Sequence, residues 1–189
     1  MKDNLFSTPF WKIKVPNHQS IKEKYLQSFI DGYEKKIFDI PEDWVTHKCH
    51  TSFKDNKILE KDICDEYSSV LNSIIEKEWS GKVEYWWQVY KDNEYQEWHN
   101  HMPSTLSAIH FLNFEDEHLA PIFEDPNKNV RSIINQTSLN KDLSSPLSYT
   151  PKVEEGDMII FPSYLNHTVP AGKYKSYRVT IAINLNIQL

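Results

Sequence analysis

Apolar positions in the first 80 residues recur with a helical period. Between Asn17 and Lys36, large apolar residues stand at steps of four: Ile21, Tyr25, Phe29 and Tyr33. This spacing predicts a helix with one buried face, and Pro41 ends the region. A second helix is predicted from Lys57 to Trp79. Its apolar stripe indicates core packing and comprises Leu59, Ile63, Tyr67, Val70, Leu71, Ile74 and Ile75.

After Gly81 the pattern changes to the two-residue alternation of β-strands. Residues 83–90 are rich in β-formers, and residues 105–114 alternate. The alternation puts these residues on one face: Leu106, Ala108, His110, Leu112 and Phe114. Short strands are predicted at 130–134 and 158–161, and a long strand at 177–187. The rest of Asp125 to Ser148 is polar and rich in turn residues, so we interpret it as loop.

Helices followed by strands predict an α+β, mainly β fold, in which helices support an antiparallel sandwich or barrel. The length of 189 residues fits a single domain covering residues 1–189. We expect residues 1–80 to form a helical buttress and residues 81–189 to form the β core.

Charge and composition exclude several classes of function. The net charge is −6 and no basic run is present, which argues against nucleic acid as a partner and mildly favours a neutral or cationic substrate. No apolar stretch of about 18 residues predicts a membrane span. Two cysteines, Cys49 and Cys64, make no disulfide framework, so we expect a reducing, cytoplasmic setting. The tract His47 to His50 is spaced too tightly for a common zinc site and is interpreted as surface.

Three histidines have the spacing of metal ligands. His99 and His101 are separated by one residue, and on a strand such residues point to the same face. His167 follows a second strand-and-turn unit and offers a third ligand. Neutral imidazoles suit iron, zinc or copper, and three protein ligands leave positions open for catalysis. An isolated His-x-His pair is often two surface side chains, so the surrounding residues matter.

The residues around His167 favour a site rather than a surface pair. A turn at Gly156 and Asp157 begins a buried strand, which Pro162 ends because proline lacks the N–H group of the ladder. Arg178 then opens the last strand. Arg178 and Thr180 point the same way, into the space that His167 also borders. A guanidinium forms a fork that matches a carboxylate.

Taken in order, these motifs resemble the 2-oxoglutarate/iron(II) oxygenases, and more narrowly the small prolyl-hydroxylase-like branch found in marine phages and bacteria. The distal half carries Gly-Asp-x-x-x-Phe-Pro-Ser-x-x-x-His over 156–167, then Arg-x-Thr-Ile-Ala-Ile-Asn over 178–184. The proximal half is similar over 96–103 and 106–112. Residues 121–126 resemble the short middle strand of the family, and residues 4–10 resemble the start of the branch.

The resemblance implies a double-stranded β-helix (jelly roll) with N-terminal flanking helices. It implies a dioxygenase that hydroxylates a peptide side chain or a small molecule, in the cytoplasm of a bacterial cell or infected host. The cofactors would be Fe(II), 2-oxoglutarate and O2. The implied metal ligands are His99, His101 and His167, with Arg178 binding the far carboxylate of 2-oxoglutarate and Thr180 assisting.

The chain departs from the family at one ligand. The usual triad is His-x-Asp/Glu with a distal His, and here His101 holds the carboxylate position. The spacing favours His101 as a ligand. The other interpretations are a two-histidine site with an added water and a site that prefers zinc or copper.

Further residues are candidates for the same site. Tyr90 is in phase with Gln88 and Trp86 and is predicted to hydrogen-bond the cosubstrate, while Trp86 is predicted to be core. Ser107 is predicted to contact a cosubstrate carboxylate, with a solvent-facing hydroxyl as the alternative, and His110 is interpreted as a core histidine.

Two functional alternatives and one specificity element complete the predictions. The 125–148 loop is a candidate lid or specificity element. One alternative is a cupin-type metalloprotein, although residues 102–106 lack the expected glutamate. The other is an inactive jelly-roll binding module.

Overall fold

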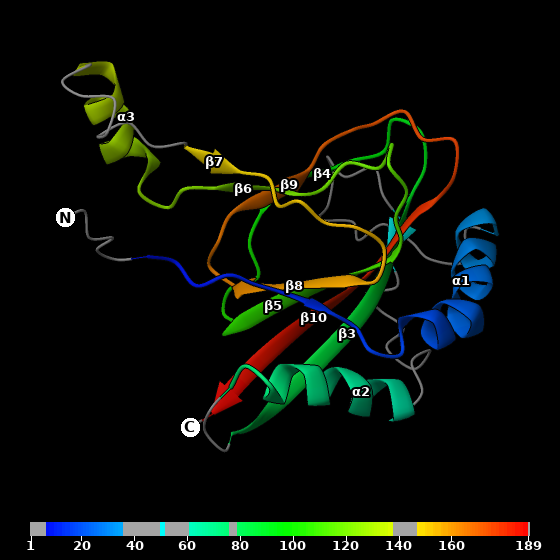
Figure 1. The fold of residues 1–189 in the computed structure, drawn as a ribbon. Coiled ribbons are helices and arrows are strands. Elements are labelled where there is room, and N and C mark those ends of the chain that lie inside the picture. The colour runs from blue at the N-terminus through cyan, green and yellow to red at the C-terminus, as the bar shows by residue number, and fades with distance from the viewer. Residues whose placement is uncertain (1–6, 36–49, 52–60, 76–78, 138–146, 189) are drawn as a thin grey trace.

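The computed structural model describes residues 7–35, 50–51, 61–75, 79–137 and 147–188. Two antiparallel sheets face each other, and two helices cover the outer face of the larger sheet (Figure 1). This layering confirms the predicted mainly β architecture with N-terminal helices. The tract at 47–49 lies outside the described residues. Within the described part of the chain, no helix has the length and hydropathy needed to cross a membrane.

The major sheet has six strands in the order β1-β8-β5-β10-β3-β2. Their bounds are β1 Trp11–Lys14, β8 Asp157–Pro162, β5 Leu106–Asn113, β10 Arg178–Gln188, β3 Ser80–Tyr90 and β2 His50–Thr51. The minor sheet has the order β4-β9-β6-β7. Its strands are β4 Gln96–His99, β9 His167–Val169, β6 Ile122–Glu124 and β7 Ser148–Tyr149. β1 was not predicted, because the first 80 residues were interpreted as helical.

Both predicted helices form and share one core with the major sheet. Helix α1 spans His18–Glu34, and α2 spans Lys61–Asn72, ending earlier than the predicted Trp79. Phe29 of α1 stacks on Trp87 of β3 with ring centroids 5.0 Å apart. The core contributed by the helices consists of Ile21, Tyr25, Phe29, Tyr67, Val70 and Leu71. Burying these side chains holds the sheet against the helices, since each contributes about 1.5–3 kcal/mol.

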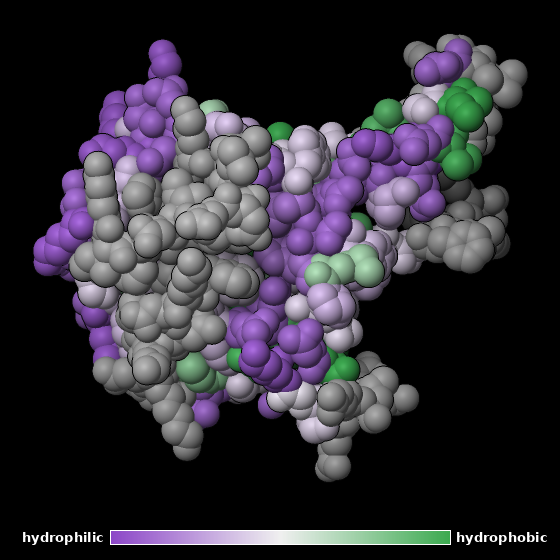
Figure 2. Space-filling view, turned by 180° about the vertical axis from the view of Figure 1, so that it is seen from behind, coloured by the Kyte–Doolittle hydropathy of each residue, from purple (hydrophilic) through white to green (hydrophobic). Residues whose placement is uncertain are grey.

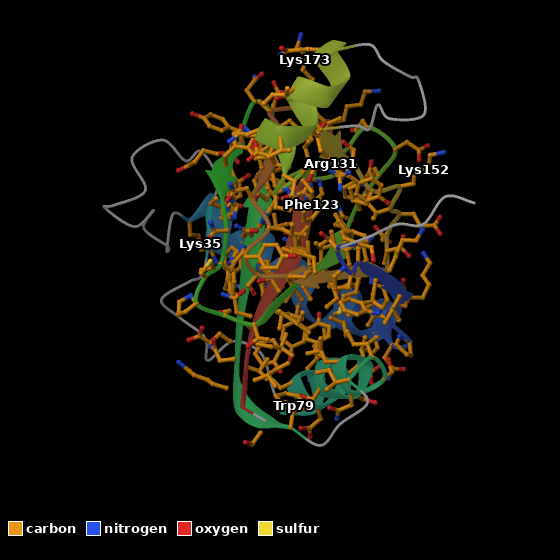
Figure 3. All side chains as sticks on the ribbon, turned by 90° about the vertical axis from the view of Figure 1, so that its left-hand side faces the viewer. Lys35, Trp79, Phe123, Arg131, Lys152 and Lys173 are labelled. Carbon is orange, nitrogen blue, oxygen red and sulfur yellow. The ribbon has the colours of Figure 1, made fainter. Side chains whose placement is uncertain are left out.

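The alternation of β10 divides its side chains between two environments. Val179, Ile181, Ile183 and Leu185 join the core under the helices. Positions of the opposite phase face the space between the sheets. A second apolar cluster fills part of that space and includes Phe123 of β6 (Figure 3), whose ring lies 4.8 Å from that of Phe161 on β8.

The strict alternation predicted for 105–114 is wrong at its end. Val179 pairs with Asn113, but Thr180 pairs with Phe111, so Leu112 is an extra residue in β5. Such a bulge reverses the phase of the strand. Phe114 therefore packs with Phe111, at 4.8 Å between ring centroids, instead of sharing the face of Leu112.

The strand predicted at 130–134 is also wrong. Residues Lys128–Thr137 form helix α3, so the 125–148 segment is helical in part. A turn begins it, because the Asp125 side chain accepts a bond from the Asn127 amide and its carbonyl accepts one from the Lys128 amide. Val130 and Ile133 stand three residues apart, which is a helical spacing. Both are exposed, and Figure 2 shows apolar side chains on this projecting arm.

Candidate active site

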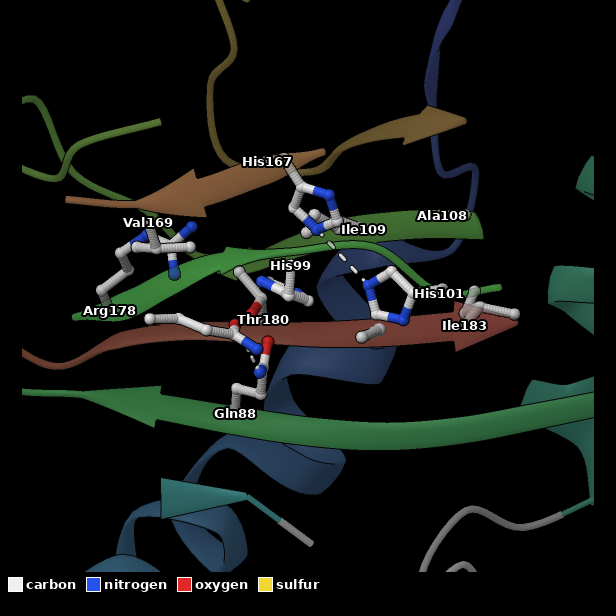
Figure 4. A pocket seen from close by; sticks show the side chains of 12 residues that line it. Gln88, His99, His101, Ala108, Ile109, His167, Val169, Arg178, Thr180 and Ile183 are labelled. Atoms are coloured by element: carbon white, nitrogen blue, oxygen red, sulfur yellow. Dashed lines mark hydrogen bonds between the residues drawn. The ribbon is translucent and has the colours of Figure 1, made fainter. Parts of the chain in front are cut away.

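The sheet register brings the three predicted ligands together. His99 ends β4, His167 begins β9, and the two residues are paired across these strands. His101 lies beyond the end of β4, so the predicted strand spacing does not explain its position. Its backbone N–H donates to the carbonyl of Ser163 at 2.9 Å, and this bond turns the imidazole toward the other two (Figure 4).

The imidazole nitrogens are close enough to share one metal ion. One nitrogen from each ring lies within 4.8 Å of the other two, and the Nε2 atoms of His101 and His167 are 3.3 Å apart. Two ligands at right angles around one ion, each bonded at about 2.1 Å, stand about 3 Å apart. The three histidines therefore fit a single ion.

Backbone carbonyls set the tautomers of two of these histidines. Nδ1 of His99 lies 2.8 Å from the carbonyl oxygen of Glu97, and Nδ1 of His167 lies 3.0 Å from that of Leu165. A carbonyl only accepts hydrogen bonds, so each Nδ1 carries the proton and each Nε2 presents a lone pair. This second hydrogen bond is the usual support of a metal-binding histidine.

Burial keeps two of the imidazoles in the form that binds metal. Desolvation, reinforced by the nearby His99, lowers the pKa of His101 to about 3. The same causes, with His101 added, hold the pKa of His167 well below its usual value. Both side chains are neutral at pH 7, as ligation requires.

Arg178 lies at one end of the cavity beside the histidines. It is 1% exposed, its Nε donates to the carbonyl of Leu119 at 3.1 Å, and its guanidinium carbon lies 4.6 Å from the centroid of the Tyr90 ring. Thr180 lines the same cavity. Its buried hydroxyl has no hydrogen-bond partner among the described residues. The predicted inward placement of Arg178 and Thr180 is confirmed.

A glutamine network supports this end of the site. Gln96 Oε1 accepts hydrogen bonds from Gln88 Nε2 and from the hydroxyl of Tyr90, both at 2.9 Å. Tyr90 thus positions Gln96 while its ring borders Arg178. A contact between Tyr90 and the cosubstrate stays a prediction. The sequence analysis did not identify Gln96 as a site residue, because a strand of four residues is too short to show a clear alternation.

The structure does not bring Ser107 to Arg178. Ser107 is paired across the sheet with Asn184, six residues along β10 from Arg178, which corresponds to about 20 Å. Its buried hydroxyl bonds to Ser163 Oγ at 2.7 Å and to Asn184 Oδ1 at 2.9 Å. Ser107 is therefore neither at the surface nor near the carboxylate that Arg178 would bind.

His110 is confirmed as a core histidine on the helix-facing side of β5. Nδ1 bonds to the hydroxyl of Tyr67 at 2.6 Å, and Nε2 bonds to Nδ1 of His18 at 3.0 Å. Burial, with the nearby His18, lowers the pKa of His110 to about 3. The residue is thus a neutral member of a buried hydrogen-bond chain.

A wider cavity of about 360 Å³ opens beside His99 and His101, and we refer to it as the outer cavity. It shares Gln96, His99 and His101 with the cavity of Arg178. The other residues that line it are Glu84, Trp86, Glu97, Trp98, Asn100, Met102, Pro103, Ser104 and Asn184. Trp86 is buried as predicted, but it also lines this cavity. Asn184 lies six residues after Arg178 on β10 and so faces the same side of the strand. Alternation alone could therefore have identified Asn184 as an inward-facing residue.

Solved structures of similar fold include several oxygenases. A prolyl-4-hydroxylase from Pseudomonas putida aligns with a TM-score of 0.62 and 12% identity, over 95% of this chain and 93% of its own. A prolyl hydroxylase from Trichoplax adhaerens, in complex with a hypoxia inducible factor peptide, aligns at 0.64 and 13%, over 95% and 84%. HygX from Streptomyces hygroscopicus, with nickel and 2-oxoglutarate bound, aligns at 0.61 and 10%, over 95% and 83%. At these identities the likeness shows the fold, which is the predicted double-stranded β-helix.

The family is shown by a sequence match. Residues 84–184, which span the three histidines and Arg178, match the family model described as "Putative 2OG-Fe(II) oxygenase". A search of curated proteins found no match. The family match favours neither the cupin-type alternative nor the inactive module. With its fold and its histidine cluster, this chain belongs to the 2-oxoglutarate/iron(II) oxygenases and is a 2-oxoglutarate-dependent dioxygenase.

Proposed function

We propose that His99, His101 and His167 hold the iron(II), that Arg178 and Thr180 bind the far carboxylate of 2-oxoglutarate, and that the enzyme hydroxylates a peptide side chain or a small molecule. One observation carries this proposal. Three converging imidazoles, two of them fixed by backbone carbonyls, stand between a buried arginine and an open cavity.

The histidines would supply an uncharged set of ligands. Their Nε2 lone pairs would take three positions on the iron, whose redox chemistry couples decarboxylation of 2-oxoglutarate to oxidation of a C–H bond. With His101 in place of a carboxylate, the ligands carry one negative charge fewer than the usual triad. The protein ligands would therefore neutralise less of the charge of the ion, and the dianionic cosubstrate would neutralise a larger share of it.

Arg178 and Thr180 would orient the cosubstrate. The Leu119 carbonyl and the Tyr90 ring hold the guanidinium in place, so its fork needs no rearrangement to accept a carboxylate. The Thr180 hydroxyl, two residues along the same face of β10, would donate a further hydrogen bond. Burial strengthens both interactions, because water competes little at such a site.

We also propose that residues 1–189 act as one oxygenase domain, because α1 and α2 share their core with the major sheet. A reducing, cytoplasmic compartment is proposed on two grounds. A chain with two cysteines has no disulfide framework, and the ion must remain iron(II).

The test is an anaerobic spectral titration of the apoprotein with iron(II) and then with 2-oxoglutarate. A visible metal-to-ligand charge-transfer band that saturates at one equivalent, and is absent in His167→Ala, is the expected result. Arg178→Ala should weaken 2-oxoglutarate binding about 100-fold, from the loss of charge-assisted hydrogen bonds, with iron affinity nearly unchanged.

Arg131→Ala is the matched control, because this partly exposed arginine on α3 pairs with Asp125 away from the histidines. It should bind iron and 2-oxoglutarate like the wild type. Equal losses of iron and 2-oxoglutarate in Arg178→Ala would contradict the proposed role of Arg178. Iron binding without a band in the wild type would contradict the proposed use of 2-oxoglutarate.

A further inference from the structure

We infer that the substrate carries a positively charged group, an ammonium or a guanidinium, and that this group binds in the outer cavity beside Glu84, Glu97 and Trp98. The inference rests on the proposed function, because that function assigns the cavity of Arg178 to the cosubstrate.

The position of the two cavities determines the direction from which the substrate arrives. Arg178 lies at one end of the site, and His101 lies toward the other (Figure 4). The outer cavity meets the histidines from the side of His101 and extends toward Asn184. A C–H bond that is to be oxidised at the metal must therefore enter through the outer cavity, while the remainder of the substrate contacts its lining.

The described lining of the outer cavity carries carboxylates. The described residues around it include Glu84 and Glu97 and neither lysine nor arginine. Glu84 pairs with Lys82 at 2.6 Å, but the lysine side chain is largely exposed. Exposed pairs are weak because water and salt screen them. A substrate cation can therefore replace the lysine at Glu84, and the described part of the lining favours cationic groups over anionic ones.

Aromatic and thioether groups add a second feature that suits an organic cation. Trp86 is buried in the cavity wall, and Trp98 is 50% exposed and Met102 67% exposed at its rim. A tryptophan face attracts ammonium and guanidinium groups, and its apolar surface receives the methylene chain that usually carries them. Large apolar side chains left exposed beside carboxylates favour a ligand with both an apolar stem and a charge.

Asn184 gives the cavity a directed hydrogen-bond donor. The side chain is buried, at 7% exposure, and its Oδ1 accepts a hydrogen bond from Ser107, whose hydroxyl also bonds to Ser163. With the amide oxygen engaged, the NH2 group is left to face the cavity. It would bind a carbonyl or hydroxyl oxygen of the substrate and orient the molecule relative to the histidines.

The test compares pairs of probes that differ in charge. The probes are acetyl-Gly-Lys-Gly-amide with its Nε-acetyl-lysine counterpart, and acetyl-Gly-Arg-Gly-amide with its citrulline counterpart. Binding is measured by calorimetry on the protein loaded anaerobically with iron(II) and 2-oxoglutarate. At least one cationic probe should bind about 10-fold more tightly than its neutral counterpart, and added salt should reduce that ratio.

Variants locate the preference in the outer cavity. The double variant Glu84→Gln/Glu97→Gln should reduce the ratio to below about 3-fold, because two nearly isosteric changes remove both carboxylates. Asp116→Asn is the control, since it makes the same type of charge change at an exposed turn residue outside the cavity. It should keep the full ratio. Circular dichroism establishes that each variant is folded.

Several results would overturn the inference: equal binding of cationic and neutral probes, an unchanged ratio in the double variant, or no detectable binding of either cationic probe at about 10 mM. The charge-transfer band separates this failure from failure of the proposed function. A band without a charge preference refutes the cationic substrate alone. If the band is absent, the same titrations on the metal-free protein decide the inference about the cavity independently.

Discussion

Acid should destabilise this protein through His110, and the size of the effect follows from its burial. The pKa of His110 is lowered from 6.5 to about 3 in the folded chain. In the unfolded chain His110 is therefore protonated below about pH 6.5, whereas in the folded chain it is protonated only below about pH 3. The stability contributed by neutral His110 is complete above pH 6.5 and declines as the pH falls toward 3. At about pH 5 the loss amounts to about 2 kcal/mol.

The assay is urea unfolding of the metal-free protein at about pH 7.5 and pH 5, followed by tryptophan fluorescence. His110→Gln removes the titrating group and keeps an amide that can bond to its neighbours. Desolvation by burial also lowers the pKa of His18, His101 and His167, and their effect is present in both proteins. The wild type should therefore lose about 2 kcal/mol more than the variant on acidification. A loss that is the same in both proteins would refute the reasoning.

Three further predictions concern packing, backbone and metal. Phe29→Ala should lower the free energy of unfolding by about 3–5 kcal/mol, measured in urea, because the fully buried ring stacks on Trp87; a loss below about 1 kcal/mol would contradict the packing. Gly156→Ala should cost at least about 1 kcal/mol, since φ is +83° and a Cβ would lie 3.1 Å from the His18 ring; an unchanged melting temperature would contradict it. Zinc at about 100 times its Kd should raise the free energy of unfolding by about 2.7 kcal/mol in the wild type and not in His167→Ala; equal gains in both would place the ion elsewhere.

Periodic segments of the chain were predictable because one physical constraint dominates each of them. In α1, the four-residue spacing of Ile21, Tyr25 and Phe29 reflects burial against a single sheet. In β10, the two-residue alternation correctly placed Arg178 and Thr180 inward, because both faces of this central strand are covered. Patterns of this kind are visible in the sequence because each helical turn, or each second residue of a strand, must place a side chain on the same buried face.

The failures occurred where local pattern and tertiary context disagree. The Val130 to Ile134 run is rich in β-branched residues, but it stands outside the sheets and its helical spacing prevails in α3. β1 is only four residues long, and its pairing with β8 lies more than 140 positions away. No local pattern reveals such a contact. The bulge at Leu112 was equally invisible, because one extra residue in a ladder leaves the composition unchanged.

In the site, too, local pattern predicted some features and tertiary contacts determined others. The histidines were identified from their spacing, yet the position of His101 depends on a backbone bond to Ser163 that only the folded chain supplies. Ser107 was placed on the correct face of β5 but at the wrong end of the sheet for the carboxylate bound by Arg178, since alternation specifies the face of a strand and gives no information on register. The outer cavity depends on both face and register, so of its lining only His99 and His101 were predicted as site residues.

The continuous pairing of β10 with β3 has a consequence for how the gene can change. Every residue from Arg178 to Gln188 has a partner on β3, and β5 flanks the other side. Deleting one codon after Val179 within this ladder would exchange the faces of all residues on one side of the deletion. If the preceding residues shift, Arg178 moves to the position of Val179 in the apolar core. We expect scanning deletion libraries to show both long strands as one intolerant block, with length variation confined to connections such as residues 170–177.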